Sequence, residues 1–267
     1  MKNKICSSFG EAISDITDGA TIMMFAWGMG GTPQNLIRAL YEKKVKDLTV
    51  ISHNFMPHPV GDQLFPLTEV FTPLSLYDQV KKVITAWPGS SIMGIKSPLE
   101  SRIEAGEVEL EIMSHGTLIE RVRAGASGLG GFYTPVGVGT IVEKGKEKKV
   151  IDGKEYILEK PLVADFAFVR AHKADKRGNL IYRGSTRGAN PVIAMAANVT
   201  IAEVDDIVEV GELDPEVIVT PDIFVHRIVR IPYDGLGSFN HRATLLRKVF
   251  QEGYTTDKQL VSKPWTM

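Results

Sequence analysis

The 267-residue chain is 43% hydrophobic and carries a formal net charge of −1. Its length suits one large α/β domain or two small ones, and its hydrophobic share supports a sizeable core. The near-zero charge gives no electrostatic case for binding nucleic acid or an anionic membrane. The single cysteine, Cys6, excludes a disulfide within the chain and fits a reducing compartment.

The sequence carries no recognisable targeting or membrane segment. Its N-terminus has two lysines but lacks the long apolar region of a signal peptide. No uninterrupted apolar run approaches the roughly 20 residues that a membrane helix needs. We therefore expect a cytoplasmic globular protein that does not associate with a membrane.

The first elements of the chain predict a parallel βαβ unit. Apolar residues recur at roughly helical spacing over residues 7–18, and residues 20–25 form an apolar run of strand length. A helix is expected over 32–44, followed by a second buried strand at 48–51. Ligands of such a unit collect beyond the carboxyl ends of its parallel strands.

A Gly-rich loop lies between the first strand and the following helix. Gly28, Gly30 and Gly31 allow positive φ angles and close approach of the backbone to a ligand. Thr32 is a good N-cap and Pro33 suits the first helical position, so we expect free backbone N–H groups at this helix N-terminus. Such groups can hold an anion or a developing oxyanion. The alternative is a tight turn in which glycine only permits packing; the spacing is not the dinucleotide-binding fingerprint.

The middle of the chain is less regular. Prolines and aromatic residues break up residues 55–79, which we interpret as a short helical piece and loops that could form a lid. Thr117 and Glu120 form a capping box for a helix that Gly125 would end. Six glycines within 125–140 exclude a regular element, while the apolar residues between them indicate an ordered, buried loop. Strands are also expected at 80–86 and 108–113, with a helix at 97–105 between them.

The remaining elements extend the sheet. Asp152-Gly153 between apolar pairs predicts a β-hairpin within 143–160, whose charged run we interpret as a solvated arm. Strands are expected at 164–170, 199–202 and 217–219, with a polar turn at 172–179 and a helix at 190–197. We expect one open, mostly parallel α/β sheet domain over residues 1–231, flanked by helices and carrying the hairpin as an excursion. Residues 232–267 would be a C-terminal extension, with a helix at 245–250.

Four long segments of the sequence resemble the α subunit of family I coenzyme A transferases of the 3-oxoacid type. In the family's first signature, Asp18-Gly19, Ile22-Met23-Met24, Gly31 and Pro33 are in register. Phe25-Ala26-Trp27 stands where the family has Gly-Gly-Phe. The other strings lie within residues 116–140, 164–191 and 203–219, and together the four span roughly residues 5–230. The resemblance implies the fold of the coenzyme A transferase α subunit.

The resemblance also implies a chemistry. A glutamate attacks an acyl-CoA thioester, gives an enzyme-bound anhydride and is converted to a glutamyl-CoA thioester, which a free carboxylic acid then takes up. In the family this glutamate lies in a Ser-Glu-Asn-Gly stretch of the β half, and no Ser-Glu-Asn-Gly occurs here. No nucleophile is therefore expected on this chain. The expected partner is a separate β subunit in an α2β2 or larger complex, with coenzyme A as substrate and no permanently bound cofactor or metal.

A set of site residues follows from the resemblance. The 27–32 loop would donate backbone N–H groups to the thioester oxygen, where one such donor is typically worth ~3 kcal/mol. His53 and Asn54 match asparagine-like positions near the reacting centre, and His115 stands where the commonest relatives have glutamine. The backbone at 128–132 would approach the nucleophile or the thioester. The full expected set is Trp27, Gly28, Met29, Gly30, Gly31, Thr32, His53, Asn54, His115, Gly128, Gly130, Gly131 and Phe132.

Other interpretations stay open at this point. His53 and His115 could be hydrogen-bonded structural histidines, and with His58 they lack the tight ligand spacing of a metal site. The Phe25-Ala26-Trp27 and His115 departures motivate a second hypothesis, the α subunit of an acyl-CoA hydrolase or ring-opening hydrolase on the same scaffold. A third hypothesis is a non-enzymatic scaffold or regulatory protein with a vestigial pocket.

Overall fold

A central sheet of parallel strands organises the computed structural model, which describes residues 3–25, 31–55, 59–60, 63–64, 72–89 and 96–233. Its strand order is β13-β12-β10-β1-β2-β5-β6, and the short strand β11 pairs antiparallel with β10. The sheet strands are β1 (Thr21–Met24), β2 (Leu48–Ile51), β5 (Val80–Thr85), β6 (Glu109–Ile112), β10 (Ala164–Asp175), β11 (Leu180–Ile181), β12 (Ala197–Val208) and β13 (Arg227–Arg230). The described helices are α1 (Phe9–Ala12), α2 (Gln34–Lys43), α3 (Pro98–Glu104), α4 (His115–Ala126) and α5 (Asn190–Ala194).

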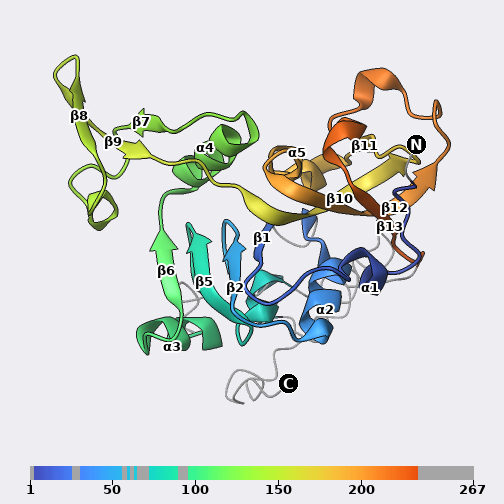
Figure 1. Cartoon of the computed structure of the whole chain (residues 1–267), viewed down its shortest axis with the longest axis horizontal. Coiled ribbons are helices and arrows are strands. Elements are labelled where there is room, and N and C mark those ends of the chain that lie inside the picture. The colour runs from blue at the N-terminus through green and yellow to red at the C-terminus, as the bar shows by residue number, and fades with distance from the viewer. Residues whose placement is uncertain are drawn as a thin grey trace.

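Helices cover both faces of this sheet. Because side chains alternate along a strand, Met23 and Met24 of β1 belong to two different core clusters. The Met24 cluster packs against α1, α2, α3 and the 3₁₀ turn η2 (Pro73–Leu76), and the Met23 cluster packs against α4 and α5. Figure 1 shows α4 and α5 near the top of the view and α2 and α3 toward the bottom. The predicted α/β class, with a mostly parallel sheet flanked by helices, is confirmed.

The order of the strands reverses direction at β1. From β1 the chain builds outward through β2, β5 and β6, and it then returns to the other side of β1 with β10, β12 and β13. All these neighbours pair in parallel. In open α/β sheets, ligands bind outside the carboxyl ends of the strands at such a switch point. The Gly-rich loop leaves β1 at this place.

A three-stranded arm projects from the central body. It consists of β7 (Phe132–Thr134), β8 (Lys148–Ile151) and β9 (Lys154–Glu159), in the order β7-β9-β8, and Figure 1 shows it extending beyond β6. Asp152 and Gly153 form the β8–β9 turn with φ angles of 49° and 77°, so the predicted hairpin is confirmed. Arg121 of α4 holds the base of the arm by donating to the Lys160 carbonyl at 2.7 Å. A two-stranded hairpin, β3 (Pro59–Val60) with β4 (Gln63–Leu64), forms a separate small sheet.

Strand predictions hold best for the short strands on one side of the sheet and for β1. β1, β2, β5 and β6 lie where the sequence predicts them. By contrast, β10 and β12 are twelve residues each, because their polar carboxyl halves pair with one another through Asp175 and Val208. The expected polar turn at 172–179 therefore starts only after Asp175. The strand predicted at 217–219 is wrong, since the 3₁₀ turn η6 (Pro215–Val217) occupies part of it, and β13 was not expected.

Two helix predictions also need correction. The N-terminal helix covers only Phe9–Ala12, capped by Ser8, instead of the whole of 7–18, and residues 13–15 form a turn. The helix α5 ends at Ala194 rather than near residue 197, because the chain enters β12 at Ala197. The predicted helix at 97–105 is confirmed as α3, whose Ser97 and Glu100 form a capping box.

The boundaries of α4 differ from the sequence prediction for a packing reason. Ser114 is the N-cap and accepts from the Thr117 N–H, so Thr117 lies inside the helix rather than capping it. Gly125 does not end the helix, which runs on to Ala126. A Cβ at Gly125 would lie 2.1 Å from the Leu162 carbonyl oxygen, so glycine is needed here for close approach of the segment between β9 and β10.

The loop predicted at 125–140 is only partly as expected. It is ordered, but it contains β7, and its apolar residues are half-buried or, as at Leu129 and Val136, exposed on this chain rather than buried. About half of the possible lid at 55–79 (residues 56–58, 61–62 and 65–71), the helix predicted at 245–250 and nearly all of the extension 232–267 lie outside the described residues, so the boundary at residue 231 stays a prediction. Among the described helices, none has the length and apolar character that a membrane span requires.

Candidate active site

The N-terminus of α2, directly after the Gly-rich loop, is capped from within the chain. Pro33 takes the N-cap position and has no side-chain hydrogen bond, so the predicted Thr32 cap is wrong. Instead the Glu203 carboxylate of β12 accepts from the backbone N–H groups of Asn35 and Leu36, both at 3.0 Å. The N–H groups of the flanking helical residues bond to the Thr32 and Pro33 carbonyls.

This arrangement overturns one sequence expectation. The N–H groups of the first turn of α2 were expected to be free for a ligand anion, yet each of them has an acceptor in the protein. A carboxylate at a helix N-terminus interacts favourably with the helix dipole, and Glu203 fills that role. Any oxyanion bound here must therefore take its hydrogen bonds from the loop itself rather than from α2.

Glu203 lies in a buried ionic group that spans β10 and β12. Glu203 and Arg170 are register partners on these strands, and Arg170 Nε lies 3.8 Å from Glu203 Oε1. Arg170 also pairs with Asp205, whose second oxygen lies 3.2 Å from His172 Nδ1. Burial raises the pKa of Glu203 to about 7, against the opposing effects of Arg170 and of the hydrogen bonds from Leu36 and Asn35.

Asn190, the first residue of α5, fastens the end of the Gly-rich loop. Its side-chain nitrogen donates to the Gly31 carbonyl at 3.2 Å and to the Thr186 carbonyl at 3.0 Å, and its side-chain oxygen accepts from the Arg170 N–H at 3.1 Å. A Cβ at Gly31 would meet the Thr186 carbonyl oxygen at 3.0 Å. The close approach of the backbone at Gly31 therefore favours glycine there.

Aromatic and imidazole rings gather at the carboxyl ends of β1, β2 and β6. The Phe25 ring stacks on His53 with centroids 5.9 Å apart, and the His53 and His115 rings lie 6.0 Å apart. Asn54 Nδ2 lies 2.6 Å from His53 Nε2, and because an amide nitrogen can only donate, this contact requires an unprotonated Nε2. His53 is buried, whereas His115, at the start of α4, is exposed.

The other predicted site residues fall into two groups. Trp27, Gly28, Met29 and Gly30 lie outside the described residues. The segment 128–132 follows the C-terminus of α4, and twelve residues at ~1.5 Å each put roughly 18 Å of helix between it and His115. The structure thus brings Phe25, His53, Asn54 and His115 together, and it places residues 128–132 at the base of the arm.

Two buried polar side chains flank this cluster. Gln34 and Ser52 are fully buried, and within the described part of the chain neither the Gln34 amide nor the Ser52 hydroxyl has a hydrogen-bond partner. Buried polar groups are nearly always satisfied, so each needs a partner from the loop or from a bound molecule. Gln34 opens α2 and Ser52 follows β2, which places both beside the switch point.

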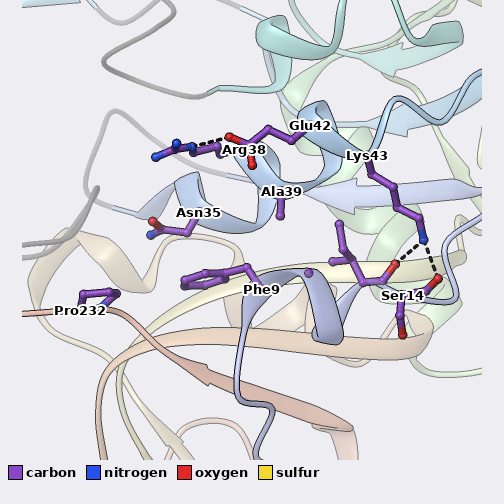
Figure 2. A pocket seen from close by; sticks show the side chains of 10 residues that line it. Phe9, Ser14, Asn35, Arg38, Ala39, Glu42, Lys43 and Pro232 are labelled. Carbon is purple, nitrogen blue, oxygen red and sulfur yellow. Dashed lines mark hydrogen bonds and ion pairs between the residues drawn. The ribbon is translucent and has the colours of Figure 1, made fainter.

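A separate groove of about 640 Å³ lies between α1 and α2 (Figure 2). Its basic side chains already have partners in the protein: Arg38 pairs with Glu42, and Lys43 donates to the Ile13 and Ser14 carbonyls. The groove lies away from the carboxyl ends of β1, β2 and β6, and we do not assign the reaction to it. The residues that the structure describes include no cluster of His, Cys, Asp or Glu side chains arranged to hold a metal ion.

The sequence patterns assigned no role to Glu203, Arg170 or Asn190. A signal was nevertheless present, because Phe166, Phe168 and Arg170 alternate along one face of β10, as Ile201 and Glu203 do along β12. When ionisable residues continue an apolar core face at the carboxyl ends of two strands, they indicate a buried ionic group there.

Known proteins share this architecture. The family model for coenzyme A transferase matches residues 6–230, and the chain therefore belongs to the coenzyme A transferase family. It is 43% identical over 231 residues to the A-type subunit of 3-oxoadipate CoA-transferase from Pseudomonas putida, covering 86% of this chain and 95% of that protein. It is 42% identical over 231 residues to the α subunit of acetate CoA-transferase from Escherichia coli, covering 86% and 97%. The predicted family and subunit type are confirmed.

Solved structures support the fold. Glutaconate coenzyme A-transferase from Acidaminococcus fermentans superposes with a TM-score of 0.68 at 16% identity, covering 97% of this chain and 92% of that one. The acyl-CoA transferase of E. coli O157:H7 superposes with a TM-score of 0.70 at 22% identity, covering 89% of this chain and 49% of that one. At these identities the similarity is one of fold.

The raised pKa of Glu203 predicts a pH-dependent stability. The folded chain binds this proton more tightly than the unfolded chain, so the stability that Glu203 contributes below about pH 4.5 is lost as the pH rises through about 7. The change from 4.5 to about 7 corresponds to roughly 3 kcal/mol. We expect the free energy of unfolding of wild type relative to Glu203→Gln to fall by about that amount between pH 4.5 and 7.5. Urea unfolding of both chains at a series of pH values measures it, and a difference that stays constant with pH would contradict the raised pKa.

Proposed function

We propose that the chain is the α half of a two-subunit enzyme that moves coenzyme A between an acyl-CoA and a free carboxylic acid. The observation that carries the proposal is the Gly-rich loop at the switch point, with His53, Asn54 and His115 beside it. The family membership and the relatives named as A-type or α subunits support it. In this proposal the loop of residues 27–32 donates backbone N–H groups to the thioester oxygen.

The proposed reaction conserves the thioester through covalent intermediates. A glutamate carboxylate on the partner attacks the thioester carbon, the C–S bond breaks, and coenzyme A leaves as the thiolate. The thiolate then attacks the glutamyl carbonyl of the resulting anhydride and releases the original acyl group as a carboxylate. The acceptor carboxylate then attacks the glutamyl thioester and displaces the coenzyme A thiolate. The thiolate attacks the acceptor's carbonyl in the new anhydride, which frees the glutamate and forms the new acyl-CoA without net hydrolysis. In each attack the carbonyl oxygen gains negative charge, which the loop would stabilise.

The nucleophile is assigned to the partner because the site residues that the structure describes offer no suitable carboxylate. Phe25, His53, Asn54 and His115 include none. Glu203, the carboxylate next to the loop, is fully buried and its oxygens accept from the first turn of α2. The sequence also has no Ser-Glu-Asn-Gly stretch. A separate β subunit would therefore complete the site.

The names of the relatives guide the choice of substrate. Curated relatives include subunits of a 3-oxoadipate CoA-transferase and of an acetate CoA-transferase, and the human succinyl-CoA:3-ketoacid coenzyme A transferase 2 is 39% identical, with this chain covering 43% of its length. We infer a short-chain or 3-oxoacyl substrate. The hydrolase hypothesis is not favoured, since these relatives are named as transferases, and the hypothesis of a non-enzymatic scaffold loses its basis for the same reason.

The transfer reaction is tested with the chain and its β subunit purified together. We expect turnover of acetoacetyl-CoA to require an added acid such as succinate, because the glutamyl thioester needs an acceptor. We also expect borohydride to inactivate the complex after exposure to acyl-CoA, with the label on a glutamate of the partner. Steady thioester consumption without any acceptor acid, together with an unlabelled partner, would refute the transferase proposal.

His115 is proposed to lie at the substrate. His115→Ala should lower kcat at least roughly tenfold, as the loss of one polar contact to a reacting group does, while the complex still assembles. Glu120→Ala, at another exposed position of α4, is the matched control and should leave kcat unchanged, because within the described part of the chain Glu120 pairs with Arg123 at the surface. Wild-type kcat in His115→Ala would assign His115 a structural role.

A further inference from the structure

The Gly-rich loop is fixed at both ends by buried residues. At its start Phe25 is buried in the core against His53, and at its end the Gly31 carbonyl is bound by Asn190. Just beyond, Glu203 binds the first turn of α2. Asn190 and Glu203 both contact Arg170, one through its backbone N–H and the other through its side chain. We call Asn190, Arg170 and Glu203 the loop clasp.

The loop clasp does more than a helix cap has to do. A Ser, Thr, Asp or Asn at position 33 would cap α2 locally and would avoid burying an ionisable group. Position 33 is instead proline, and the cap comes from Glu203, 168 residues further along the chain than Asn35. A cap from a distant strand also fixes the start of α2 relative to β10 and β12. Because Gly31 and Thr32, the described end of the loop, directly precede α2, the position of that end is defined too.

We propose that Glu203 is a positioning residue, which with Arg170 and Asn190 holds the Gly-rich loop at the distance from the sheet that the acyl-transfer reaction needs. This inference rests on the proposed function of the loop. A displacement of about 1 Å in a reacting geometry can cost roughly 100-fold in rate, so a loosened clasp lowers kcat even though none of its members touches the substrate.

The charges around Glu203 make its role dependent on pH. Arg170 faces it from β10 and the Asn35 amide faces it from α2, while its register partner on β13 is the apolar Val229. Asp205 pairs with Arg170 and contacts His172, and Arg230 of β13 pairs with Asp206. Protonation of Glu203 removes the negative charge that both Arg170 and the α2 N–H groups bind. Glu203→Gln reproduces this uncharged state at every pH.

The test compares Glu203→Gln with wild type in the assembled complex with the β subunit. The readouts are kcat per assembled complex, KM for acyl-CoA and the pH profile of kcat, measured as thioester consumption. We expect kcat to fall roughly 100-fold with KM changed less than about threefold, and the decline of wild-type kcat on acidification through about pH 7 to be absent in the variant. Glu209→Gln, at an exposed position directly after the same strand, is the matched control and should behave as wild type.

The outcomes separate this inference from the proposed function. Assembled Glu203→Gln complex with the wild-type kcat and pH profile would overturn the inference, as would a lower yield of complex with unchanged kcat, which is what a purely structural cap predicts. If Glu203→Gln fails to assemble, Asn190→Asp serves instead, because it places an oxygen against the Gly31 carbonyl and should lower kcat in the same way. A wild-type complex that consumes thioester without transferring it would refute the proposed function, while a fall of that activity in the variant would still support the positioning role.

Discussion

One buried carboxylate constrains the arrangement around the loop. Glu203 extends from β12, the neighbour of the edge strand β13, to the first turn of α2, where it binds the N–H groups of Asn35 and Leu36. A carboxylate removed from water is costly unless it is paired and hydrogen-bonded, and Arg170 supplies the opposite charge. The start of α2, the spacing of β10 and β12 and the end of the Gly-rich loop are therefore coupled, because each of them bears on this group.

The topology explains why these features meet at one place. Strand order reverses at β1, and in open α/β sheets ligands bind at such a switch point. Phe25 and Gly31, the described ends of the loop, lie there, Arg170 and Glu203 are buried on the neighbouring strands β10 and β12, and His53 and His115 follow β2 and β6. In the proposed enzyme this chain supplies oxyanion binding and loop position, and the partner supplies the nucleophile. Such a division makes each chain incomplete alone.

The sequence predicts those features that depend on local pattern. Short apolar runs predict β1 and β2, and Asp152-Gly153 predicts the arm hairpin. The cap of α2 was predicted wrongly because Thr32 is locally suitable, whereas the residue that caps the helix lies on a distant strand. Gly125 was misassigned for a similar reason, since its contact with Leu162 exists only in the folded chain. The histidine cluster followed from strand ends and resemblance, but the loop clasp depends on the pairing of β10 with β12.

The central claim is that this chain holds a Gly-rich loop, through Glu203, against a thioester whose nucleophile belongs to the partner. A crystal structure of the complex trapped as the glutamyl-CoA thioester tests it most directly. We expect the thioester carbonyl oxygen within roughly 2.7–3.1 Å of backbone N–H groups of residues 27–32, with Glu203 still bound to Asn35 and Leu36. A thioester seated away from this loop, or a Glu203 carboxylate released from α2 in the trapped state, would refute this role of the loop and of Glu203.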